Sequence, residues 1–154
     1  MIVAAYDRSP WLLFVHIAAA FLFFGGALTM TIASVAAAHA RDAAETVVLA
    51  RVAARVDLLL VWPALVILVG AGAQLANDED AYGSGWLRLG IVLTAVVALA
   101  VAVLVSWLNR RQLRQAESGV AEGGPGPAFV LLGTLSLVLL VVVFWLMTAK
   151  PGIV

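Results

Sequence analysis

The side chain best suited to chemistry is His16, which lies in an apolar run without Asp, Glu, Lys or Arg from Ser9 to Ala40. In a helix it follows Pro10 by about 9 Å along the axis, a depth in a membrane at which an ionisable side chain often marks a functional site. A neutral imidazole can ligate a haem iron or another metal ion, or carry protons. The structural alternative is a histidine that hydrogen-bonds a neighbouring helix. Both interpretations of His16 stay open at this point.

A second ligand for a cofactor at His16 is harder to find. His39 is the only other histidine, and it lies about 34 Å away if one helix carries both. Met147 is the soft ligand expected on the same side as His16, although a lone methionine in an apolar helix more often packs. Arg88 and Lys150 could hold the propionates of a haem b, or anchor the chain at lipid headgroups. The predicted cofactor site is therefore His16, Met147, Arg88 and Lys150, with His16 as the metal ligand.

Four apolar runs must position these side chains. A span needs about 20 apolar residues to cross about 30 Å of hydrocarbon, and residues 9–40, 58–77, 89–109 and 123–149 each carry no charge. The chain is 64% hydrophobic and 12% charged, against about 25% charged in soluble domains. The sequence predicts an all-α fold, a four-helix transmembrane bundle that forms one domain over residues 1–154. The expected spans are residues 10–39, 46–76, 86–109 and 127–149.

The first run could also be a signal peptide, because Ala38-His39-Ala40 resembles a cleavage site. The run is about twice as long as the usual signal core of 7–15 residues. We therefore expect it to be the first transmembrane helix. The third helix is expected to continue beyond its span, since residues 109–117 are polar but helix-prone.

Arginine placement predicts the orientation. Links one and three, with the adjoining helix ends, hold six arginines, and the other side holds three basic residues. Short basic links stay in the cytoplasm, so both termini are expected outside (N-out/C-out). The six arginines are Arg41, Arg51, Arg55, Arg110, Arg111 and Arg114. Tryptophans near the helix ends agree with this orientation.

Three features of the helices bear on packing. Asp57 lies at a hydrocarbon boundary, where an ion pair with Arg110, Arg111 or Arg41 is a better expectation than a proton relay. Gly25-Gly26, Gly70 and Gly72 let helices approach closely, or leave a slot for a flat cofactor. Pro63 lies inside helix two and removes a backbone hydrogen bond, which predicts a kink.

Several function classes can be set aside. The net charge is zero and there is no cysteine, which argues against nucleic acid as a partner and against thiolate chemistry. Phosphate-binding loops, paired carboxylates in a span, nucleophile–base pairs and HExxH motifs are also missing from the sequence. No catalytic residue is predicted.

The order of several short motifs resembles a family of small bacterial membrane proteins, domain of unknown function 2269. The matching pieces are Trp11-Leu-Leu-Phe-Val-His16, Gly25-Gly26, Ala40-Arg-Asp42, Asp57…Pro63…Gly70-x-Gly72, Gly85-Trp-Leu87 and Met147-Thr-Ala-Lys-Pro151. More distantly, the first helix is similar to CopD-type copper-resistance proteins and HemJ-type protoporphyrinogen oxidases. The HemJ resemblance implies a haem at His16. It also implies a lysine inside a later helix, whereas Lys150 lies at the end of helix four.

Three functions follow as expectations. The first is a non-enzymatic accessory or assembly subunit in a bacterial cytoplasmic (inner) membrane, where it contacts lipid and packs as a homo-oligomer or within a larger membrane complex. The second is a haem-binding redox protein that uses His16. The third is a small-solute transporter, for which the spans offer few polar residues to line a path.

Overall fold

The structure is a computed structural model that describes residues 10–78, 81–119 and 127–149. Helix α1 (Pro10–Ala38) is followed by a long helix made of α2 (Ala43–Val56), a π-helical segment (Asp57–Val61) and α3 (Trp62–Asp78). A short 3-10 turn (Ala81–Gly83) leads to a second long helix. That helix consists of α4 (Gly85–Ala98), a π-helical segment (Leu99–Val105) and α5 (Ser106–Glu117), and α6 (Pro127–Ala149) follows.

The prediction of four membrane-length helices is confirmed. Long apolar helices cover Pro10–Ala37, Ala43–Asp78, Gly85–Glu117 and Leu131–Ala149. The described residues contain no strand, so the all-α class is also confirmed. The third helix runs to Glu117, as its polar helix-forming end predicts.

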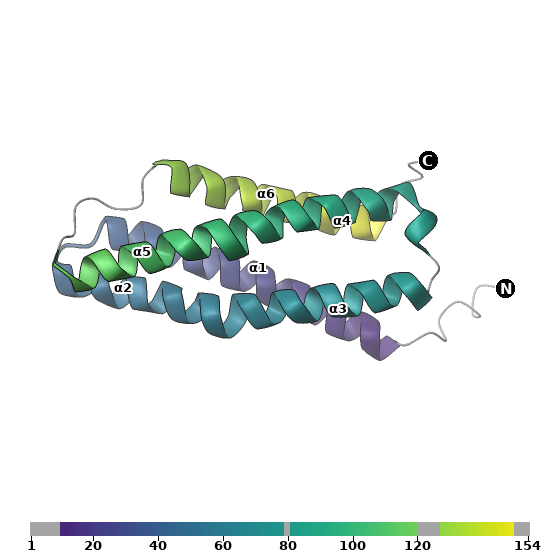
Figure 1. Cartoon of the computed structure of the whole chain (residues 1–154), viewed down its shortest axis with the longest axis horizontal. Helices are drawn as coiled ribbons and strands as arrows, with labels where there is room; N and C mark the ends of the chain where they lie inside the picture. Colours follow the sequence, from purple (N-terminus) through teal and green to yellow (C-terminus); the bar gives the residue numbers. More distant parts are fainter. Residues whose placement is uncertain (1–9, 79–80, 120–126, 150–154) are drawn as a thin grey trace.

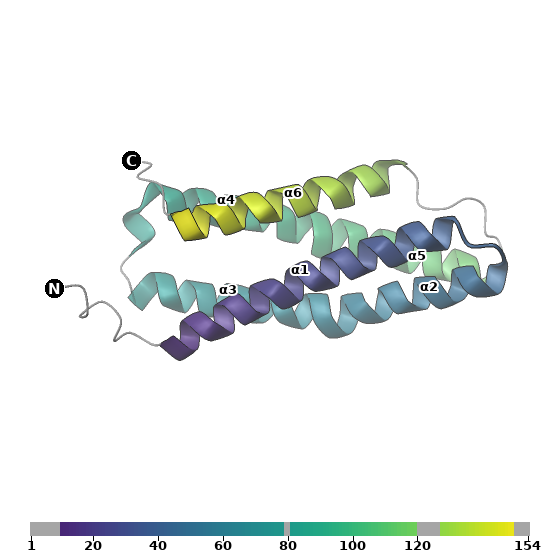
Figure 2. The same cartoon turned by 180° about the vertical axis from the view of Figure 1, so that it is seen from behind.

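The four helices lie side by side along the long axis (Figures 1 and 2). Helix α1 packs on α3 and α2, helix α4 packs on α6, and α2 packs on α5. The start of α1 and the end of α6 lie at the same end of the bundle as the connection from α3 to α4 (Figure 1). We call this the His16 end and the opposite end the arginine-rich end.

Local capping explains where the long helix made of α2 and α3 begins. The Asp42 side chain accepts a hydrogen bond from the Glu45 amide at 2.8 Å. The Glu45 carboxylate in turn accepts one from the Arg41 amide at 2.9 Å. The first bond satisfies an amide that has no partner inside the first helical turn, and the second satisfies the amide of a residue just before the helix. The link from α1 therefore stays short and the helix starts at Ala43.

The π-helical segment between α2 and α3 (Asp57–Val61) ends two residues before Pro63. Proline has no amide proton, and its ring clashes with the carbonyl one turn earlier in a regular α-helix. Here the Trp62 amide bonds the Asp57 carbonyl, five residues earlier, instead of continuing the α pattern. The disturbance expected from Pro63 therefore takes the form of a widened turn. Such π-helical insertions are frequent at functional sites.

The surface of the bundle is apolar where a soluble protein would be polar. Trp11, Leu59 and Leu131 are each about 70% exposed (71%, 72% and 70%). The interior consists of small and medium side chains, of which Phe23 and Met30 are the largest. Large apolar side chains outside and small ones between the helices are typical of a bundle surrounded by lipid.

Candidate functional site

His16 lies in the contact between α1 and α3. Its Nδ1 is 3.0 Å from the Leu68 carbonyl oxygen. A carbonyl can only accept, so Nδ1 carries the proton, and in a neutral imidazole Nε2 then has the lone pair. A Cβ on Gly72 would lie 2.8 Å from the His16 ring carbon Cε1. Gly72 therefore provides the space into which the imidazole packs.

Met147 lies in a different contact, between α6 and α4. A Cβ on Gly90 would lie 2.5 Å from the Met147 methyl carbon. His16 and Met147 thus each pack on a glycine, but these glycines belong to different helices. A haem ligated by both side chains stays a prediction.

The other predicted site residues contribute less to a site at His16. Arg88 is exposed and its Nε donates to the Tyr82 carbonyl at 3.2 Å. Lys150 lies outside the described residues. His39 is exposed and bonds the Val35 carbonyl of its own helix at 2.9 Å, as expected for a histidine at the end of a span.

A buried polar cluster lies toward the arginine-rich end. Asp57 is only 1% exposed and accepts a 2.6 Å hydrogen bond from the Ser106 hydroxyl. Its other carboxylate oxygen lies 3.5 Å from the Arg110 guanidinium. The prediction that Asp57 pairs with an arginine is confirmed for Arg110. This contact joins the second span to the third.

A second polar contact joins the first span to the third. The Ser34 hydroxyl donates to the Asn109 side-chain oxygen at 2.8 Å, and both residues are buried. Sequence reasoning missed Ser34, Ser106 and Asn109. A signal was present, because Ser106, Asn109 and Arg110 follow one another at helical spacing of three and four residues and share one face.

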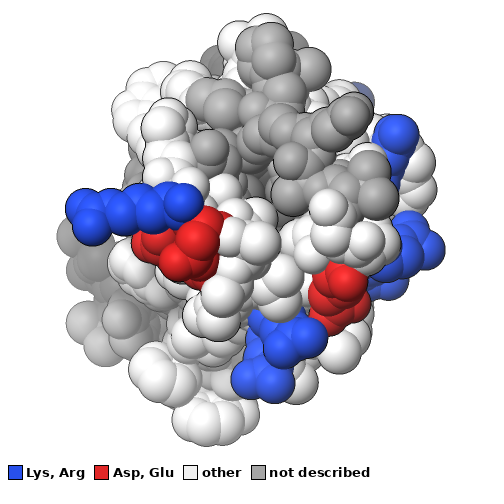
Figure 3. Space-filling model, turned by 90° about the vertical axis from the view of Figure 1, so that its left-hand side faces the viewer, with Lys and Arg blue, Asp and Glu red and all other residues white. Residues whose placement is uncertain are grey.

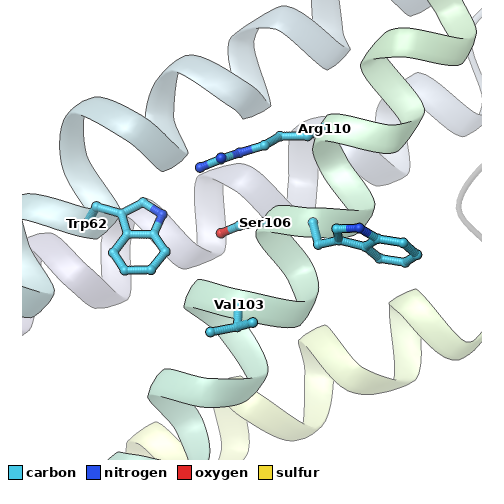
Figure 4. Close-up of a pocket in the computed structure, with 5 residues that line it drawn as sticks. Trp62, Val103, Ser106 and Arg110 are labelled. Carbon is cyan, nitrogen blue, oxygen red and sulfur yellow. The ribbon is translucent and has the colours of Figure 1, made fainter.

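An open groove of about 220 Å³ lies beside this cluster. Figure 4 shows Trp62, Ser106 and Arg110 pointing toward its centre from two helices. The Trp62 Nε1 atom is buried and has no hydrogen-bond partner among the described residues. The residues that line the groove are Trp62, Val103, Ser106, Trp107 and Arg110.

A family model described as a predicted integral membrane protein (DUF2269) matches residues 10–151. The chain belongs to this family. It is an integral membrane protein with several spans, in agreement with its four long apolar helices. No curated protein matches, and no solved structure matches. The more distant CopD and HemJ resemblance stays a prediction.

The glycines in the spans of this DUF2269 chain fall into two groups according to what lies beside them. Gly26, Gly72, Gly90 and Gly133 lie against side chains of neighbouring helices, which confirms the packing role expected for Gly26 and Gly72. Gly25 and Gly70 differ, because apart from their chain neighbours and the backbone of their own helix, no atom of the described residues lies within 4 Å of the position of a Cβ. Gly70 is exposed and Gly25 is half-buried, and we call them the outward glycines because the space beside each is open.

The geometry limits the chemistry that the DUF2269 chain can carry out with its described residues. Among them, no group of three or more His, Cys, Asp and Glu side chains gathers in the way a metal site requires. Charged side chains gather at the arginine-rich end (Figure 3), where Arg51 pairs with Glu117 at 3.0 Å on the surface. The distinctive features are His16, the buried polar cluster, the groove and the outward glycines.

Proposed function

We propose that this protein is a non-enzymatic accessory or assembly subunit that associates with other membrane-spanning chains. The observation that carries the proposal is the open space around Gly25 and Gly70. Lipid tails are as apolar as leucine, so helices in a membrane associate through close packing at small residues. An outward glycine gives up lipid contact area and leaves the backbone open to a neighbouring helix.

The surroundings of both glycines suit a helix from another chain. Thr29 is exposed one turn beyond Gly25 and its hydroxyl donates to the Gly25 carbonyl at 2.8 Å, so this face is small and its polar atom has a partner. On α3, Ala73 follows Gly70 by three residues and is also exposed. Each surface contains a pair of small residues spaced by three or four positions, as in known membrane helix pairs.

Arginine distribution supports an orientation for this subunit. The proposed topology places the arginine-rich end in the cytoplasm and the His16 end outside, with the bacterial inner membrane as the location. The partner is then a second copy of this chain or a larger complex in the same membrane. The fold as one domain over residues 1–154 belongs to the same proposal.

Association is tested by measuring the mass of the protein extracted in a mild detergent, using size-exclusion chromatography with light scattering. We expect a species larger than one chain that becomes monomeric in Gly25→Leu or Gly70→Leu. Val69→Leu is the matched control, because it adds volume on the same helix about a quarter turn away. A monomeric wild type, or association that survives both glycine substitutions, would overturn the proposal.

One observation favours a second candidate, haem binding at His16. The Leu68 carbonyl fixes the proton on Nδ1, and ligating histidines commonly donate their other ring nitrogen to a carbonyl in this way. His16 Nε2 would hold the iron, which supplies electron-transfer chemistry when bound. Arg88 and Lys150 are the cations proposed for the propionates.

An absorption spectrum of the purified protein, before and after dithionite, tests this candidate. Haem binding predicts a Soret band that His16→Ala abolishes, whereas Met147→Leu keeps or loses it according to whether Met147 is the second ligand. A featureless spectrum after growth with a haem precursor would rule the candidate out. Transport of a small solute stays a prediction that no contact described above favours.

A further inference from the structure

Two hydrogen-bond donors with unused capacity face each other across the groove between the second and third spans. Trp62 Nε1 can only donate, and it is buried without an acceptor among the described residues. Arg110 lies opposite, with its guanidinium extended toward Trp62 (Figure 4). A buried donor without a partner is costly, so a turn of the Trp62 ring that brings Nε1 to an acceptor in the groove would stabilise this arrangement.

Asp57 does not use up the donors of Arg110. Direct hydrogen bonds between a guanidinium and a carboxylate are about 2.7–2.9 Å long. The Arg110–Asp57 separation is 3.5 Å, and the Asp57 Oδ2 atom makes no hydrogen bond within the described part of the chain. Asp57 therefore orients the guanidinium by charge, while the guanidinium N–H groups stay available to a ligand.

The walls of the groove identify the kind of ligand. Val103 and Trp107 are about half exposed (52% and 51%) and line the groove with apolar surface. The Arg111 guanidinium lies over the Trp107 ring, 5.7 Å from its centre. Tryptophan and arginine next to an apolar run are typical of the headgroup level of a membrane. A ligand here meets donors at one end and apolar side chains at the other.

We propose that this groove binds the phosphate of a phospholipid headgroup. Arg110 and the Trp62 N–H donate to the phosphate oxygens, and the acyl chains follow the apolar wall at Val103 and Trp107. Arginine is well suited to phosphate because its planar fork donates several hydrogen bonds at once. The lipid would bridge the second and third spans where Asp57 and Ser106 already join them. This site does not depend on association through Gly25 and Gly70.

Native mass spectrometry of the full chain, titrated with dioleoylphosphatidylglycerol, tests the proposal. Arg110→Gln is expected to weaken binding of the lipid about tenfold, as for loss of a charged hydrogen bond. Trp62→Phe keeps the ring but removes the N–H, and it is expected to weaken binding about threefold. Arg114→Gln, which removes the same charge one turn further along α5, is the matched control and should leave binding unchanged.

Two further measurements test whether the phosphate group is recognised and whether it belongs to a lipid or to a soluble ligand. Dioleoylglycerol, which has no phosphate, should bind wild type and Arg110→Gln equally weakly. Inorganic phosphate should not displace the lipid, and displacement would overturn the lipid assignment in favour of a soluble phosphate ligand. Equal lipid binding by wild type, Arg110→Gln and Trp62→Phe would overturn the site itself. Circular dichroism and thermal unfolding confirm that each variant is folded, and Trp62→Phe should unfold no earlier than wild type because it removes the unpaired donor.

Discussion

The two ends of the bundle hold their helices together in different ways. Toward the arginine-rich end, side chains of different spans bond one another, Ser106 with Asp57 and Ser34 with Asn109. Toward the His16 end, helices approach at Gly72 and Gly90, and His16 bonds a backbone carbonyl. Both solutions address the same problem, because lipid offers no hydrophobic drive for helices to associate. The difference predicts that polar substitutions matter most at one end and small volume changes at the other.

Asp57→Ala should have the largest effect on stability. It leaves the Ser106 hydroxyl without its acceptor and removes the partner of Arg110, and breaking a buried pair costs about 3–5 kcal/mol. Because the Arg110 side chain is 55% exposed, we expect a loss near the lower limit, about 3 kcal/mol. Unfolding in bicelles by steric trapping measures this loss. An effect no larger than that of an exposed alanine substitution would show that the cluster does not hold the spans together.

Gly72→Ala should have the next largest effect, about 2 kcal/mol, because overpacking a tight contact costs about 1–3 kcal/mol. The new methyl group would meet the His16 ring, which the Leu68 carbonyl holds in place. Gly90→Ala is the matched control. It meets only the flexible methyl end of Met147 and should cost less than about 0.5 kcal/mol. Equal costs for the two variants would contradict the role assigned to His16.

The hydrogen bond between Ser34 and Asn109 should contribute less to the free energy of unfolding than the contact at Gly72. A double-mutant cycle of Ser34→Ala and Asn109→Ala is expected to give a coupling energy of about 0.6 kcal/mol, the average for such bonds between membrane helices. The same unfolding assay measures it. A coupling energy of zero would mean that the two side chains contribute only through their separate contacts.

The ion pair between Arg51 and Glu117 should have the smallest effect. Both side chains are about half exposed (55% and 43%), and exposed pairs contribute about 0.2–1 kcal/mol and weaken with salt. Glu117→Gln should therefore lower stability by less than about 0.5 kcal/mol at low salt and have no effect at 1 M salt. A cost that persists at high salt would contradict the interpretation of this pair as a weak surface contact.

Much of the fold could be predicted from the sequence, because uncharged runs of about 20 residues require a membrane. The pairing of Asp57 with an arginine of the third span was predictable for a related reason, since a carboxylate near hydrocarbon needs a cation. The Ser34–Asn109 contact was not, because it depends on how two helices are rotated against each other. The hydrogen-bond partner of His16 could not be predicted either, since every residue has a backbone carbonyl and the sequence does not single out that of Leu68.

Gly70 and Gly72 also show that the sequence does not reveal how the helices are rotated against each other. Gly70 and Gly72 lie two residues apart and both suit close packing, but only the structure shows that His16 fills the space beside Gly72 and that the space beside Gly70 is open. The proposed function depends on this difference. Gly72, between two helices of this chain, accommodates the His16 ring, whereas Gly70 leaves space for a helix of another protein.

The most direct test places a photo-crosslinking amino acid at Val66, which is 67% exposed and one turn from Gly70, and irradiates intact cells. We expect a discrete crosslinked product, either two copies of this chain or this chain with one other membrane protein. Gly70→Leu should abolish the product, whereas Val69→Leu should not. Crosslinks to lipid alone, or a product unchanged by Gly70→Leu, would contradict an accessory subunit that binds through this face.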